Sequence, residues 1–140
     1  ILYAEQEGWL AVFREVLAEV PPELSLAQAA INAVLHMPPI GDPAILDLID
    51  ELKEREPSPE IKSAILAVED LARRELAEAL AERNGVPLAE DPKPAIIAAA
   101  TIAASGWFRE YHVLAPGFDM SQAPAQFSKV LKVALGPFDD

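Results

Sequence analysis

Two histidines, His36 and His112, are the residues best suited to acid–base or metal chemistry, and they form no paired-ligand motif. His36 closes a helical pattern, where an imidazole commonly caps the last carbonyls or packs in a core. Its alternative role is a polar contact inside a pocket. His112 ends an aromatic run with Trp107, Phe108 and Tyr111. Such a run favours packing in a core or at an interface over a ligand cage.

Three further polar residues have the types that catalytic or binding sites use. Thr101 and Ser105 are one helical turn apart in an alanine-rich stretch. Hydroxyls at this spacing usually bond to carbonyls of their own helix, and less often they line a cavity. Glu69 has Arg73 four residues later, so we expect an exposed ion pair within one helix.

Motifs of known enzymes are absent from the sequence. It contains no GxGxxG, P-loop, GxSxG or HExxH pattern, and no Glu-x-x-His pair for a di-iron site. It also has no cysteine, which removes disulfides and thiol chemistry and suits the cytoplasm. A Ser-His-Asp triad assembled from distant positions stays open as an alternative. We expect no enzymatic activity, no metal and no cofactor.

The charge balance argues against nucleic-acid binding by this chain. It has 11 Lys and Arg against 23 Asp and Glu, a net charge of −12. A protein that neutralises phosphates needs the opposite balance. Residues 42–60 hold seven acids and two bases, which indicates a solvated acidic face because the spacing does not suit calcium. Residues 92–138 hold only six charged side chains. We therefore expect the helices of this region to be buried in a core or against a partner.

Apolar residues recur with a helical period, and 140 residues suffice for one domain with its own core. The longest uncharged run, residues 94–108, is too short and too rich in alanine to span a membrane. We predict an all-α fold, a six-helix antiparallel bundle. Its helices cover about 1–19, 26–37, 43–55, 59–84, 92–114 and 121–135.

Local signals set these boundaries. Ser25 and Gln28 form a capping box. Three dipeptides place an N-cap side chain before a proline at the first helical position: Asp42-Pro43, Ser58-Pro59 and Asp91-Pro92. Three glycines suit the left-handed residue that ends a helix: Gly85, Gly117 and Gly136.

The order of these helices and their local sequences resemble the C-terminal half of the tetracycline-repressor-like (TetR/AcrR) transcriptional regulators. The opening segment Gln6-Glu7-Gly8-Trp9-Leu10 resembles the helix that joins the DNA-binding domain to the regulatory domain. The segment from Arg55 to Ile61 and the long helix that ends at residues 76–85 are also similar. The alanine-rich helix from Ala95 to His112 and the final helix resemble the pair that forms a four-helix bundle across a dimer.

This resemblance implies that residues 1–140 are an effector-binding and dimerisation domain, in which a homodimer binds a small apolar molecule. The family's helix-turn-helix is missing, so we expect it upstream of Ile1 in a longer, cytoplasmic bacterial regulator. Operator DNA would be bound only through that missing part, and this chain alone should not bind duplex DNA. The alternative is a helical dimerisation or protein-interaction module with a filled core and no ligand.

The expected ligand pocket follows from side-chain size. Alanines at residues 98–104 leave space if bulky neighbours hold the helices apart, whereas tight packing of these alanines would leave none. The predicted ligand-binding residues are Trp9, Phe13, Asn32, His36, Met37, Ile65, Glu69, Thr101, Ser105 and Trp107. The predicted dimer-interface residues are Phe108, Tyr111, His112, Phe127, Val130, Leu131, Ala134 and Leu135.

Overall fold

The structure, a computed structural model, describes residues 2–37 and 50–138, apart from the side chains of residues 2–7 and 9. Within these ranges the chain is helical and contains no strand, as predicted. The long elements are α1 (Leu2–Glu19), α2 (Leu26–Leu35), α4 (Pro59–Asn84), α5 (Lys93–Phe108) and α6 (Ala123–Leu135). Three short ones are η1 (Arg109–Val113), η2 (Met120–Gln122) and η3 (Gly136–Phe138). Residues 50–54 are also helical, whereas the rest of the predicted 43–55 helix and its Asp42-Pro43 cap are mostly outside the described residues.

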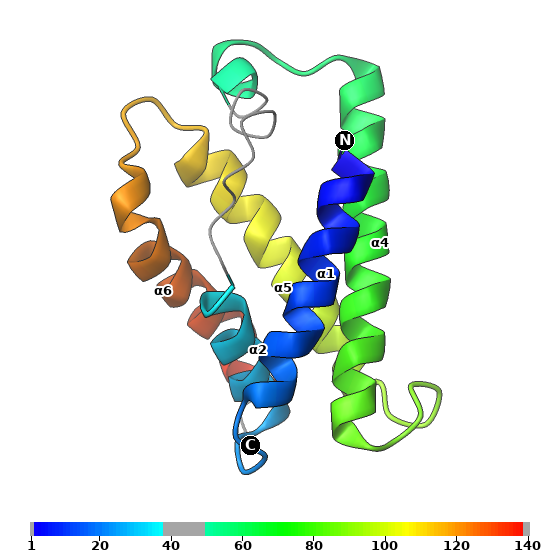
Figure 1. Cartoon of the computed structure of the whole chain (residues 1–140). Coiled ribbons are helices and arrows are strands. Elements are labelled where there is room, and N and C mark those ends of the chain that lie inside the picture. Colours follow the sequence, from blue (N-terminus) through cyan, green and yellow to red (C-terminus); the bar gives the residue numbers. More distant parts are fainter. Residues whose placement is uncertain (1, 38–49, 139–140) are drawn as a thin grey trace.

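The helices form a bundle in which α4 and α5 make the most extensive contact (Figure 1). The α1 and α4 helices lie side by side and run in the same direction, while α5 returns antiparallel to α4. The α6 helix packs against α5, and the short α2 contacts α1 and α6. The antiparallel order of the last three long helices is therefore confirmed.

Helix boundaries largely follow the predicted caps. The hydroxyl of Ser25 accepts the Gln28 N–H at 3.1 Å, and the Gln28 side chain accepts the Ser25 N–H in return. Ser58 accepts the Ile61 N–H at the start of α4, and Gly85 ends α4 with a φ of 73°. Gly136 caps the C-terminus of α6 as predicted, but it is not left-handed, because its φ is −51° and the chain continues directly into η3.

The predicted 92–114 helix consists of an α-helix followed by a π-helical turn. The α-helix starts at Lys93, whose N–H is bound by the Asp91 carboxylate at 3.0 Å. It ends at Phe108 and continues as the π-helical turn η1, in which the Leu114 N–H reaches the Arg109 carbonyl at 2.9 Å. Such a turn holds one more residue than an α-helical turn, and the hydrophobic period does not distinguish the two.

The core lies where α1 and α4 end and α5 begins. Four alanines of α2 belong to this core, and its largest fully buried side chains are Phe13, Leu76, Leu80, Ile97 and Leu135. Small residues allow α2 to approach its neighbours closely. In α4, burial starts at Ala72, and none of the side chains of residues 59–71 is buried.

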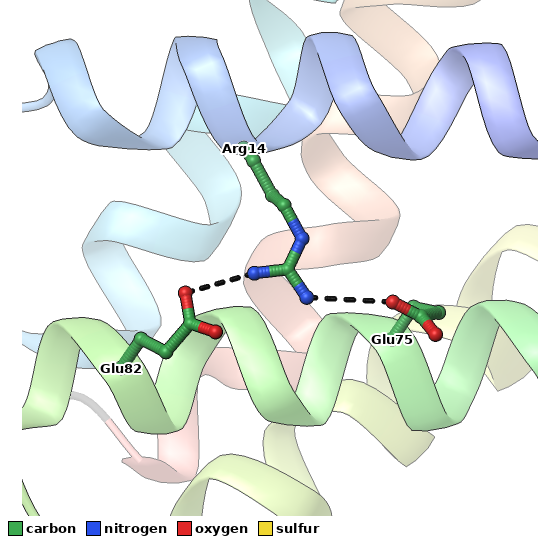
Figure 2. Close-up of polar contacts among 3 residues, drawn as sticks. All are labelled: Arg14, Glu75 and Glu82. Carbon is green, nitrogen blue, oxygen red and sulfur yellow. Dashed lines mark hydrogen bonds and ion pairs between the residues drawn. The ribbon is translucent and has the colours of Figure 1, made fainter.

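Two arginines fix α1 against α4. Arg14 extends from α1 between two carboxylates of α4, 2.8 Å from Glu82 and 3.4 Å from Glu75 (Figure 2). Burial opposes the charge of Arg14, but hydrogen bonds and attraction from Glu82 and Glu75 outweigh it and raise its pKa. Arg83 donates hydrogen bonds to the carbonyls of Leu17, Val20 and Pro21 at the end of α1. Parallel helices bring like dipole ends together, and Arg83 places a cation beside the carbonyl ends of both helices.

Candidate functional site

The outward side of α5 is an exposed, uncharged surface within the described chain. Five residues at helical spacing form it, and we call them the α5 face: Ile96, Ala99, Ala100, Ala103 and Trp107. Ile96 and Trp107 are each 47% exposed, Ala99 and Ala103 are exposed, and Ala100 is half-buried. The face carries no charge and spans about 16 Å along the helix at 1.5 Å per residue.

The opposite side of α5 is apolar as well. Ile97, Ala98, Thr101, Ala104 and Phe108 are buried against the other helices. A surface helix normally combines one apolar stripe with a polar face, and a helix that is apolar all round is normally buried all round. The exposed α5 face is therefore a candidate contact surface.

An aromatic cluster supports the end of this face, and its members are Trp107, Phe108, Tyr111, His112, Phe118 and Phe127. The Trp107 and Tyr111 rings stack at 5.4 Å and are both exposed. The His112 ring stacks on Phe108 at 5.1 Å and meets Trp107 edge-on. His112 thus serves in packing, which agrees with the interpretation favoured from the sequence.

The predicted ion pair of Glu69 with Arg73 is wrong. Glu69 instead pairs across the helices with Arg109 of η1 at 3.3 Å, while Arg73 binds Asp70 at 2.7 Å. A Cβ at Gly106 would lie 3.4 Å from the Glu69 carboxylate, so this carboxylate lies directly beside α5. The pair connects α4 to the end of α5, near Trp107.

Two of the residues predicted to line a pocket, Phe13 and Thr101, are buried in the described structure. Phe13 is 1% exposed within the packed core, and the Thr101 hydroxyl donates to the Ile97 carbonyl at 2.8 Å. Two hollows open on the described surface. One, of about 260 Å³, is lined by side chains from residues 51–61, and the other, of about 430 Å³, by side chains from residues 78–88. Neither includes a predicted pocket residue.

The other predicted pocket residues differ in their surroundings. His36 is exposed and caps α2, with its Nδ1 2.7 Å from the Asn32 carbonyl, so the predicted capping role is confirmed. Ser105 donates to the Thr101 carbonyl, as expected for a helical hydroxyl. Met37 packs against the core, and Asn32 and Ile65 are half-buried. The Trp9 side chain lies outside the described residues.

Three of the predicted dimer-interface residues need correction. Leu131 and Leu135 are fully buried within a single chain, and Phe108 is 5% exposed, so their side chains are not available to a partner. The reason is that α6 directs its apolar side toward α2 and α5 of its own chain. Tyr111 is exposed, and the remaining predicted residues are half-buried: His112, Phe127, Val130 and Ala134.

Ile96, Ala99, Ala100 and Ala103 were not among the predicted dimer-interface residues, although the sequence carried a signal for this candidate surface. Their spacing of three and four residues is that of one helix face. Equally apolar residues on the other side of the helix obscured it, because both faces look alike in an alanine-rich sequence.

In the described ranges, no group of three His, Cys, Asp or Glu side chains is placed to hold a metal ion. The described helices include none that is long and apolar enough to cross a membrane. In comparisons with known proteins, no family model, curated protein or solved structure matches the chain.

Proposed function

We propose that this chain is the dimerising regulatory domain of a TetR-like bacterial transcriptional regulator. In this proposal α5 and α6 bring two copies together, and an upstream helix-turn-helix in the same cytoplasmic protein binds operator DNA. The helix order supports the assignment, since a long central helix precedes an alanine-rich helix and an apolar final helix. The observation that carries dimerisation is the exposed, uncharged α5 face.

The charge distribution also supports association through this part of the chain. Residues 92–138 carry four basic and two acidic side chains, whereas residues 1–91 carry seven basic and nineteen acidic ones. Two copies that met through the acidic part would repel each other. Contact through α5 and α6 keeps most of the negative charge away from the interface.

Sedimentation of the chain at micromolar concentration tests this proposal. We expect a dimer, and we expect Trp107→Glu to convert it to a monomer because a carboxylate would have to be buried in an apolar contact. Leu66→Glu is the matched control, since Leu66 is 67% exposed on α4 and outside the α5 face. A wild-type chain that stays monomeric at these concentrations contradicts the proposal.

Effector binding is the second part of the proposal, and one observation favours it. Ile65 and Val68 lie on the half of α4 that has no buried side chain, although both are large and apolar. Apolar side chains that are only half-covered leave surface for a small apolar molecule. The packed core at the other end of the bundle favours the alternative, a dimerisation module with no ligand.

A neutral apolar dye such as Nile red distinguishes these alternatives. If the effector site is present, dye fluorescence should rise with the wild-type protein and fall with Ile65→Trp, which fills the space. Leu66→Trp, on the exposed side of the same turn, should leave binding unchanged. Equal binding by both variants would argue for the module without a ligand.

A further inference from the structure

The α5 face has bulky side chains at its ends, Ile96 and Trp107, and small ones in its middle, which carries only alanine. Two such helices can approach closely at the alanines if they cross there. A symmetric dimer places the same patch of both copies in contact, so each end then meets an end of the other copy.

The direction of the pairing follows from the charges beside the face. Lys93 lies one turn before Ile96, and Glu110 lies one turn after Trp107. When two helices run antiparallel with their midpoints between Ala100 and Ala103, Trp107 meets Ile96 and Glu110 meets Lys93. A parallel pairing would instead place lysine beside lysine and glutamate beside glutamate, which is unfavourable.

We infer that the dimer is held by an antiparallel α5–α5 contact, with Trp107 of each copy packed against Ile96 of the other. This inference rests on the proposed dimerisation and assigns its register. It differs from an interface built mainly on α6, whose Leu131 and Leu135 are buried in their own chain. Trp107 is the expected anchor, because an aromatic side chain contributes a large contact area at low entropic cost.

The absence of cysteine makes the register directly measurable, since any introduced thiol is the only one in the chain. In the inferred register, the two Ala103 positions lie about 4.5 Å apart along the helix axis, so Ala103→Cys should form a disulfide-linked dimer under mild oxidation. Leu66→Cys is the control, because an exposed thiol on α4 should give only slow, concentration-dependent linkage.

A charge exchange tests the direction independently. Lys93→Glu should weaken the dimer by about tenfold, because two glutamates then face each other at both ends of the contact. The double variant with Lys93→Glu and Glu110→Lys should restore wild-type affinity. Circular dichroism of each variant monitors folding, so that a loss of helix is not mistaken for a loss of pairing.

The outcomes separate this inference from the proposed function. A dimer in which Ala103→Cys does not link faster than Leu66→Cys overturns the α5–α5 register and leaves dimerisation intact. A double charge variant that stays as weak as the single one overturns the antiparallel direction. A wild-type monomer at micromolar concentration overturns both the inference and the proposed dimer.

Discussion

The helices α4 and α5 pack against each other more extensively than any other pair, yet their outward sides differ. Exposed positions of α4 are mostly charged, including Glu60, Lys62, Arg74 and Glu78, with Leu66 as the main exception. Exposed positions of α5 from Ile96 to Trp107 carry no charge. Both helices bury an apolar side in the same core, so they differ in the charge of the side chains on their outward sides. Water solvates the charged outward side of α4 well, whereas the apolar outward side of α5 would be stabilised by an apolar contact.

The inner sides of the two helices should be equally important for stability, and this is the largest expected effect. Leu80→Ala on α4 and Ile97→Ala on α5 should each lower the free energy of unfolding by about 2–5 kcal/mol, since each removes a fully buried side chain. Chemical denaturation at one fixed protein concentration measures this loss. Leu66→Ala should stay within about 0.5 kcal/mol of wild type. A similar loss for Leu66→Ala would mean that the outer side of α4 is also covered.

The polar side of α4 should contribute to stability where it is bound to α1. Arg83→Met removes three hydrogen bonds to backbone carbonyls, which leaves acceptors at the end of α1 without their partner. We expect a loss of about 1.5–3 kcal/mol in the same denaturation assay. The matched control is Arg74→Met, which removes an exposed pair with Asp70 and should change stability by less than about 0.5 kcal/mol.

The connection between α4 and α5 should show a smaller, pH-dependent effect. Asp91 binds the Lys93 N–H at the start of α5 and the Asn84 side chain at the end of α4. These hydrogen bonds lower the pKa of Asp91 below its usual value of 3.8. A lowered folded-state pKa stabilises the fold above pH 3.8, and this contribution is lost as the pH falls through the folded-state pKa.

Asp91→Ala should therefore be less stable than wild type at neutral pH, and the difference should disappear in acid. Thermal unfolding across this pH range measures it. Glu90→Ala removes a neighbouring exposed carboxylate and controls for the reduced net charge. A difference that persists unchanged into acid would show that Asp91 acts through something other than its charge.

Neither outward side should bind duplex DNA, which is the smallest expected effect. The α4 side is charged with a net excess of acids across residues 1–91, and the α5 side offers no row of cations for phosphates. Fluorescence anisotropy in about 50 mM salt, where electrostatic binding is strongest, should show no micromolar complex. Micromolar affinity there would contradict the assignment of DNA binding to a separate upstream part.

Local chemistry made several features predictable. The starts of α2 and α4 follow from Ser25 and Ser58, and the end of α4 follows from Gly85. Each of these signals acts within one turn of the chain, so it needs no knowledge of distant residues. The hydrogen bonds of Thr101 and Ser105 to their own helix were predictable for the same reason.

The sequence by itself determined that the chain is helical, where most helices begin, and that its acidic charge is concentrated before residue 92. Tertiary structure decided which side of α5 is buried, that Leu131 and Leu135 face their own chain, and that Glu69 pairs with Arg109 instead of Arg73. These choices depend on contacts between residues far apart in sequence. An alanine-rich helix with apolar residues on every side has no local preference for either face, so only packing against α4 and α6 selects one.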